Sequence, residues 1–233
     1  MYKRQPLYKV KLNNDSESHK LQCYAIWLPD ALEGNEAEKL FFESAEYLKS
    51  ECNRLGIELI GIGEFLGNAF SKHRNSAFFT VENGKALNGK IENVKRFAEL
   101  GVRIMTLTWN DNNEIGSGVL SKDKCGLTDF GKLAISEMEK YGNVIDISHA
   151  SDELFYDVAN QTNKPFIATH SNSRTVTRNP RNLTDEQIKI IISRGGIIGL
   201  NLHNAFLNNN PDKACTEDIL RHCEYCLLYT SDA

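Results

Sequence analysis

The chain has 233 residues, of which 41% are hydrophobic and 25% charged, an ordinary composition for one large globular domain or a piece of one. Its formal net charge of −4 gives no electrostatic reason to expect a nucleic-acid partner, and no apolar run approaches the ~18 residues of a membrane span. Six scattered cysteines are typical of reduced thiols, so we expect a cytoplasmic protein.

The two ends of the chain differ from the rest. Residues 1–5 and 226–233 resemble translations of a sequencing-library adapter, read forward at one end and in reverse complement at the other. We therefore expect a single partial domain over residues 6–225, from a native protein that is longer at both ends. A native signal peptide would then be lost from view.

Strand and helix patterns alternate along the chain. Apolar runs predict strands at 21–28, 57–62, 76–81, 102–108, 143–148, 166–169 and 197–202. Helical spacing, with stop and cap residues, predicts helices at 35–54 and 88–100 and helices that begin near Thr128, Ser151, Thr184 and Thr216.

This alternation predicts an α/β fold with a parallel sheet whose strands are buried on both faces. A doubly wound sheet and a (β/α)8 TIM-type barrel are the two candidates. No Gly-x-Gly-x-x-Gly follows the first strand, which lowers the nucleotide-binding option. Polar groups at the ends of separate strands, namely Glu82, Trp109, His149 and His170, favour the barrel.

Two histidines end consecutive strands, 21 residues apart at positions 149 and 170. Strand alternation places His149 on the face of Ile145 and Ile147, while Asp146 points the other way and is cast as a supporting group. Two imidazoles and the Glu82 carboxylate form a plausible set of metal ligands. The alternative is that each histidine is a hydrogen-bonded structural residue.

Other residues have roles that the sequence leaves open. Arg181 could bind a substrate carboxylate through its guanidinium fork, or could pair with a neighbour on the surface. Trp109 could wall a pocket or plug the top of the barrel, and His203 could line the cleft. The histidines expected to be solvated are His19, His73 and His222.

Several motifs in order resemble the membrane (renal) dipeptidase family of zinc peptidases, over most of residues 7 to 225. The matching segments are Val81–Gly84, Leu100–Arg103, Leu107–Asn110, Gly126–Gly131, Ile145–Ser151, Thr169–Arg174, Pro180–Asn182 and Gly195–Gly196. The resemblance implies a (β/α) barrel with two zinc ions that hydrolyses the peptide bond of dipeptides through a metal-bridging hydroxide. Glu82 would be the catalytic, bridging ligand, and His149 and His170 would hold the second zinc.

The resemblance also implies that Arg181 binds the substrate's carboxylate. Trp109 stands where some members have a substrate-contacting histidine, and Glu82-Asn-Gly replaces the common Glu-Gly-Gly. The family's first strand carries a His-x-Asp pair for the first zinc, and a late strand carries a proton-handling aspartate. We find neither here, so we expect an incomplete barrel without its first and last strands and an inactive fragment of an active dipeptidase.

Two other functions stay open. One is a different metal-dependent amidohydrolase, acting on a lactone, cyclic amide or phosphoester, and the other is a catalytically inactive barrel. The expected partner is a small peptide, and the protein could form a homodimer.

Overall fold

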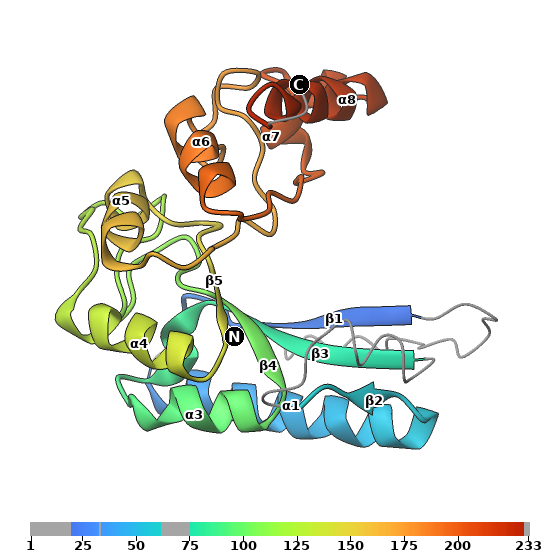
Figure 1. Cartoon of the computed structure of the whole chain (residues 1–233), viewed down its shortest axis with the longest axis vertical. Helices are drawn as coiled ribbons and strands as arrows, with labels where there is room; N and C mark the ends of the chain where they lie inside the picture. The colour runs from blue at the N-terminus through green and yellow to red at the C-terminus, as the bar shows by residue number, and fades with distance from the viewer. Residues whose placement is uncertain (1–19, 33, 62–74, 231–233) are drawn as a thin grey trace.

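The computed structural model describes residues 20–32, 34–61 and 75–230. Its strands lie together at the centre, with helices packed along the sheet and a group of later helices beyond the strand ends (Figure 1). The strands are β1 (Lys20–Trp27), β2 (Glu58–Leu59), β3 (Asn75–Glu82), β4 (Val102–Thr106) and β5 (Val144–Asp146). The longer helices are α1 (Asn35–Leu55), α3 (Glu92–Glu99), α4 (Asp129–Lys140), α5 (Asp152–Gln161), α6 (Asp185–Ser193) and α8 (Thr216–Leu227), and the short ones are η1 (Gly84–Leu87), α7 (Asn204–Leu207) and η2 (Pro211–Lys213).

The sheet is parallel throughout its described strands and follows the order β1-β3-β4-β5, with β2 paired to the start of β3. Single bridges extend this order from Asp146 to Ile167 and from Ala168 to Ile198. Apart from the short β2, neighbouring strands of the sheet therefore follow one another along the chain, as in a (β/α) barrel. Within the described residues the sheet stays open.

Local sequence signals explain where the helices begin and end. Gly56 follows α1 with a left-handed φ of 65°, a conformation that glycine adopts without steric cost. The side chains of Thr128 and Ser151 accept backbone N–H groups at the starts of α4 and α5. Thr184 and Gln187 form the expected capping box of α6.

The core lies between the sheet and the helices that cover it. Phe41 of α1 stacks on Phe97 of α3 with ring centroids 3.7 Å apart, and both rings are fully buried. Phe155 and Phe166 make a second aromatic contact at 5.6 Å. This packing fixes the strands, so the residues that follow them are presented on a rigid support.

Two expectations about the later part of the chain are wrong. Residues 197–202 were predicted to be a buried strand, yet Ile197 is 71% and Leu202 64% exposed, because no described segment covers that side. His222 was predicted to be solvated, yet it is fully buried, where its Nδ1 accepts the Ser173 N–H at 3.2 Å. His19 and His73 lie outside the described residues.

No helix in the described part of the chain is long and apolar enough to cross a membrane. All six cysteines are free thiols. The cytoplasmic setting and the adapter origin of residues 1–5 and 226–233 stay predictions, and residues 1–5 lie outside the described part of the chain.

Candidate active site

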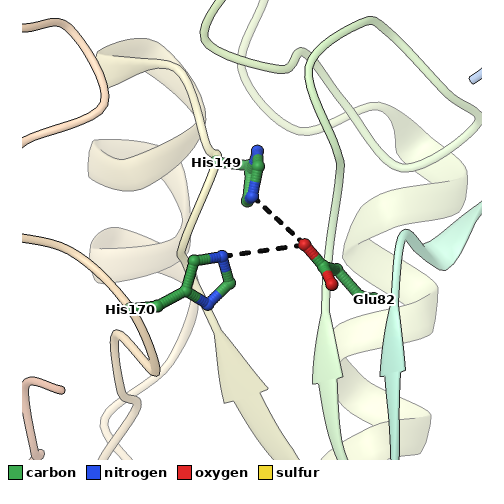
Figure 2. Close-up of side chains that lie close together, drawn as sticks. All are labelled: Glu82, His149 and His170. Atoms are coloured by element: carbon green, nitrogen blue, oxygen red, sulfur yellow. Dashed lines mark ion pairs between the residues drawn. The ribbon is translucent and has the colours of Figure 1, made fainter. Parts of the chain in front are cut away.

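Three side chains from separate strand ends meet at one point (Figure 2). Oε1 of Glu82, at the end of β3, lies 3.3 Å from His149 Nε2 and 3.7 Å from His170 Nε2. The ligand atoms of all three lie within 4.8 Å of one another. The structure thus brings together the three residues that the sequence proposed as one set.

His149 is held by a turn just after β5. Its backbone has a left-handed φ of 70°, unusual for a residue with a side chain, and its carbonyl accepts the Val119 N–H at 2.8 Å. Its Nδ1 lies 3.1 Å from Asn110 Oδ1. Burial lowers the pKa of His149 to about 2, so the ring is neutral and can offer a lone pair.

His170 is held from behind by a buried polar network. Its Nδ1 lies 2.7 Å from Thr169 Oγ1, which in turn contacts Asp146 Oδ2 at 2.6 Å. The His170 N–H donates to Ser148 Oγ at 3.1 Å. Burial lowers the pKa of His170, and the negative charge of Asp146 opposes part of that change.

The chemistry of these donors suits a cation. Burial raises the pKa of Glu82, and within the described residues its carboxylate accepts no hydrogen bond of normal geometry. The Nε2 atoms of two neutral imidazoles point toward Oε1 of the Glu82 carboxylate. A metal ion bound between these atoms would stabilise the arrangement. Glu82, His149 and His170 therefore fit a transition metal such as zinc.

Arg181 lies beside this cluster, and it is buried rather than on the surface. Its side chain is 6% exposed, and its Nε and Nη2 have no hydrogen-bond partner among the described residues. Burial lowers the pKa of Arg181 to about 10, so the guanidinium remains charged at neutral pH. A buried cation with free donors is suited to bind an anion.

A neighbouring ion pair fixes the loop that carries Arg181. Arg174 forms a two-fold contact with Asp152, the first residue of α5, at 2.8 Å for each N–O pair. The same guanidinium donates to the carbonyls of Pro180 and Asn182, at 3.1 and 2.8 Å. A pocket runs along this loop, lined by His149, Asp152, Ser171, Arg174, Arg181 and Gln187.

Trp109 lies on the other side of His149. Its ring is 6.0 Å from the His149 ring and 5.1 Å edge-on from the ring of Trp27, at the end of β1. His203, proposed to line the cleft, is exposed and packs on Phe206, whose ring lies 5.4 Å from the Arg181 guanidinium. Trp109 therefore borders the cluster.

The chain matches the membrane dipeptidase family, peptidase family M19, over residues 10–229. It belongs to this family. The match covers almost the whole chain, so the described strands and helices all lie within the matched region.

Similar proteins extend beyond this chain in length. An uncharacterized protein in the pqqA 5' region of Klebsiella pneumoniae is 35% identical over 157 residues, 63% of this chain and 58% of that protein. Dipeptidase 3 of Mus musculus is 28% identical over 188 residues, 78% of this chain and 38% of that protein. The chain thus spans less than two thirds of either relative.

Solved structures share the fold. A metallo peptidase from Rhodobacter sphaeroides, liganded with a phosphinate mimic of the dipeptide L-Ala-D-Ala, is 23% identical with a TM-score of 0.79 over 89% of this chain and 69% of that one. An amidohydrolase from Pseudomonas aeruginosa is 21% identical with a TM-score of 0.75 over 91% of this chain and 63% of that one. The predicted α/β fold of TIM-barrel type is confirmed.

The sequence did not reveal some residues that support this dipeptidase-family site. Asn110 and Thr169, which contact the two histidines, were not singled out, and neither was the pair of Asp152 and Arg174. Thr169 adjoins His170 in the chain, and both Thr169 and Asn110 lie in segments that match the family, but neither signal gave them a role. The other contacts join residues at least 22 positions apart and needed the fold to appear.

Proposed function

We propose that this chain belongs to a zinc-dependent dipeptidase and carries part of its metal site together with the group that recognises the substrate's carboxylate. The observation that carries the proposal is the convergence of Glu82, His149 and His170 within 4.8 Å, next to the buried Arg181. The Nε and Nη2 of Arg181 have no hydrogen-bond partner among the described residues. Membership of the membrane dipeptidase family supports it.

The residues of this chain would divide the work. Glu82, His149 and His170 would hold zinc, and a second zinc would need ligands besides these three. When bound, zinc supplies Lewis acidity toward a carbonyl oxygen and makes water a nucleophile near neutral pH. Glu82, with two carboxylate oxygens, can contact more than one ion.

Arg181 would select the substrate. Its free Nε and Nη2 donors form the edge of the guanidinium that pairs with a carboxylate in a bidentate way. Because Arg181 lies close to the proposed metal ligands, the substrate's carboxylate must be only a few bonds from the carbonyl that is attacked. A short peptide with a free C-terminus, such as a dipeptide, meets that requirement.

A different amide or ester substrate is the second candidate, supported by the similarity in fold to a structure described as an amidohydrolase. It requires no carboxylate at Arg181. A panel of dipeptides, lactones and cyclic amides, assayed with the zinc-loaded full-length protein, separates the two. Hydrolysis of lactones alone would reject the dipeptidase proposal.

The first test is zinc binding by this chain. We expect zinc to bind, and Glu82→Gln to abolish or strongly weaken binding, in calorimetric titration. Glu137→Gln is the matched control because Glu137 lies on the surface of α4 and pairs with Lys140. Equal zinc affinity of the wild type and the Glu82→Gln variant would show that this cluster is not the metal site.

A further inference from the structure

Thr169 stands between a proposed metal ligand and a buried carboxylate. Its Oγ1 lies 2.7 Å from His170 Nδ1 and 2.6 Å from Asp146 Oδ2. Asp146 is fully buried. One hydroxyl therefore makes short contacts with both the imidazole and the carboxylate. The direction of its proton decides whether the other ring nitrogen of His170, Nε2, carries a hydrogen or a free lone pair.

The surroundings of Asp146 determine that direction. Asp146 Oδ1 accepts the backbone N–H groups of Ser148 and Thr169, each at 2.9 Å, and Oδ2 accepts the Thr106 hydroxyl at 2.6 Å. In each of these contacts, and in the contact with Thr169 Oγ1, Asp146 is the acceptor. Since a hydroxyl has one proton, Thr169 donates it to Asp146, and its oxygen is left to accept the Nδ1–H of His170.

We propose that Thr169 is a positioning residue that, held by its hydrogen bond to Asp146, fixes His170 as the Nδ1–H tautomer. The Nε2 lone pair of His170 is then directed at the proposed metal site beside Glu82. This inference rests on the proposed function of Glu82, His149 and His170. The opposite proton arrangement would put a hydrogen on Nε2, and that nitrogen could no longer bind a metal.

The two histidines differ in this respect. His149 Nδ1 faces Asn110 Oδ1, the oxygen of a neutral amide, at 3.1 Å. His170 is linked through a hydroxyl to a carboxylate, which makes its ring the more electron-rich ligand. Loss of such a supporting contact typically weakens metal binding by about 10- to 100-fold.

The tautomer can be measured on the metal-free chain. Two-bond ¹⁵N–¹H correlation spectra distinguish a ring protonated at Nδ1 from one protonated at Nε2. We expect His170 to be Nδ1–H in the wild type and in Thr169→Ser, which keeps the hydroxyl, and to become a mixture in Thr169→Val. An Nε2–H signal in the wild type, or an unchanged signal in the valine variant, would overturn the proposal.

Zinc affinity gives the second readout. Thr169→Val should weaken zinc binding by about 10- to 100-fold, and Thr169→Ser should restore it. Thr106→Val is the matched control, because Thr106 donates to the same Asp146 oxygen but has no contact with His170. Equal losses in Thr106→Val and Thr169→Val would mean that only the burial of Asp146 matters, which contradicts the proposal.

The two readouts separate the proposals. If the wild type binds no zinc, the proposed function fails, yet the tautomer of His170 still decides the role of Thr169. Thermal melts by circular dichroism establish that each variant folds, and Thr169→Ala, with a smaller side chain, replaces the valine variant if that one does not fold.

Discussion

At the scale of single residues, Arg181 could have been a surface residue from its sequence context, but the fold buries it. The loop that follows His170 buries the Arg181 guanidinium beside the proposed metal ligands. Two of its nitrogen atoms have no partner among the described residues. An unsatisfied buried cation is costly for stability, so its retention is best explained by a ligand that completes its hydrogen bonds.

Arg181→Ala should therefore raise KM for dipeptides far more than KM for an amide without a carboxylate. Loss of one partner of a buried charged pair costs about 2–5 kcal/mol, so the rise for dipeptides should exceed about tenfold. Steady-state kinetics on the zinc-loaded full-length protein give both values. Arg178→Ala is the control, because Arg178 is exposed in the same loop and should leave KM unchanged. Equal effects of Arg181→Ala on both substrates would exclude carboxylate recognition.

Asn83, directly after Glu82, has a positive φ of 91° and is fully buried. Its Nδ2 donates to the Leu28 carbonyl and to Asp30, both at 3.0 Å, and its Oδ1 accepts Lys85 N and Asn113 Nδ2, at 3.2 and 2.9 Å. These bonds offset a backbone strain that a glycine at this position would not have.

Asn83→Ala should lower the free energy of unfolding by roughly 2–4 kcal/mol, since it keeps the strain and leaves buried groups without partners. Asn83→Gly loses the same hydrogen bonds but relieves the strain, so it should be less harmful. Urea denaturation of the three proteins gives the order. If the alanine variant is as stable as the glycine variant, strain at Asn83 is not significant.

At the scale of secondary-structure elements, the sequence predicted most helix ends because caps are local. Thr128, Ser151 and Thr184 cap the helices for which they were proposed, since a side chain and an N–H three residues away are brought together by the helix itself. The expectation that Thr216 caps the last helix is wrong, because Cys215 is the N-cap of α8 and Thr216 is its first residue. Exposure depends on distant segments instead. The burial of His222 and the exposure of Ile197 could not be read from neighbouring residues for that reason.

Helix α1 is joined to the segment η1–α3 by one carboxylate. Glu38 accepts hydrogen bonds from Asn88, Lys90 and Asn93, at 2.9, 2.6 and 3.0 Å, and pairs with Arg96 at 3.4 Å. Burial alone would raise the pKa of Glu38, but these donors together lower it to about 2. None of these partners is a proposed metal ligand, so the contact can be tested separately from the metal site.

Because the pKa of Glu38 is lower in the folded state, the unfolded state binds a proton first as the pH falls. The stabilisation is complete above the ordinary pKa of 4.5 and is lost progressively as the pH falls toward 2. Glu38→Gln should cost roughly 1–2 kcal/mol at pH 7 and flatten this pH dependence, as measured by urea denaturation between pH 7 and 3. Glu43→Gln, in an exposed pair with Lys39 on the same helix, should change neither. A wild-type slope retained by Glu38→Gln would contradict the assignment.

At the scale of the whole molecule, the parallel order of strands explains how distant residues form one site. Glu82, His149 and His170 were recognisable from sequence because Glu82 ends β3, while the two histidines follow β5 and the bridged segment beside it, and the ends of parallel strands share one rim. The supporting contacts were not recognisable, because their geometry depends on how loops fold over that rim. The same convergence brings three potential ligand atoms within 4.8 Å of one another, so we expect a bound metal ion to stabilise the folded chain.

Zinc should therefore raise the melting temperature of the chain. A ligand that binds only the folded state at 100 times its Kd adds about 2.7 kcal/mol, which for a chain of this size corresponds to roughly 5–10 °C. Melts followed by circular dichroism with zinc, and after removal of zinc with EDTA, measure the shift. His170→Asn should abolish it because one of three ligands is lost, whereas His203→Asn, at an exposed histidine, should retain it. An equal shift in His170→Asn would place the stabilising zinc elsewhere, since a site that keeps its affinity without His170 cannot be the one formed with Glu82 and His149.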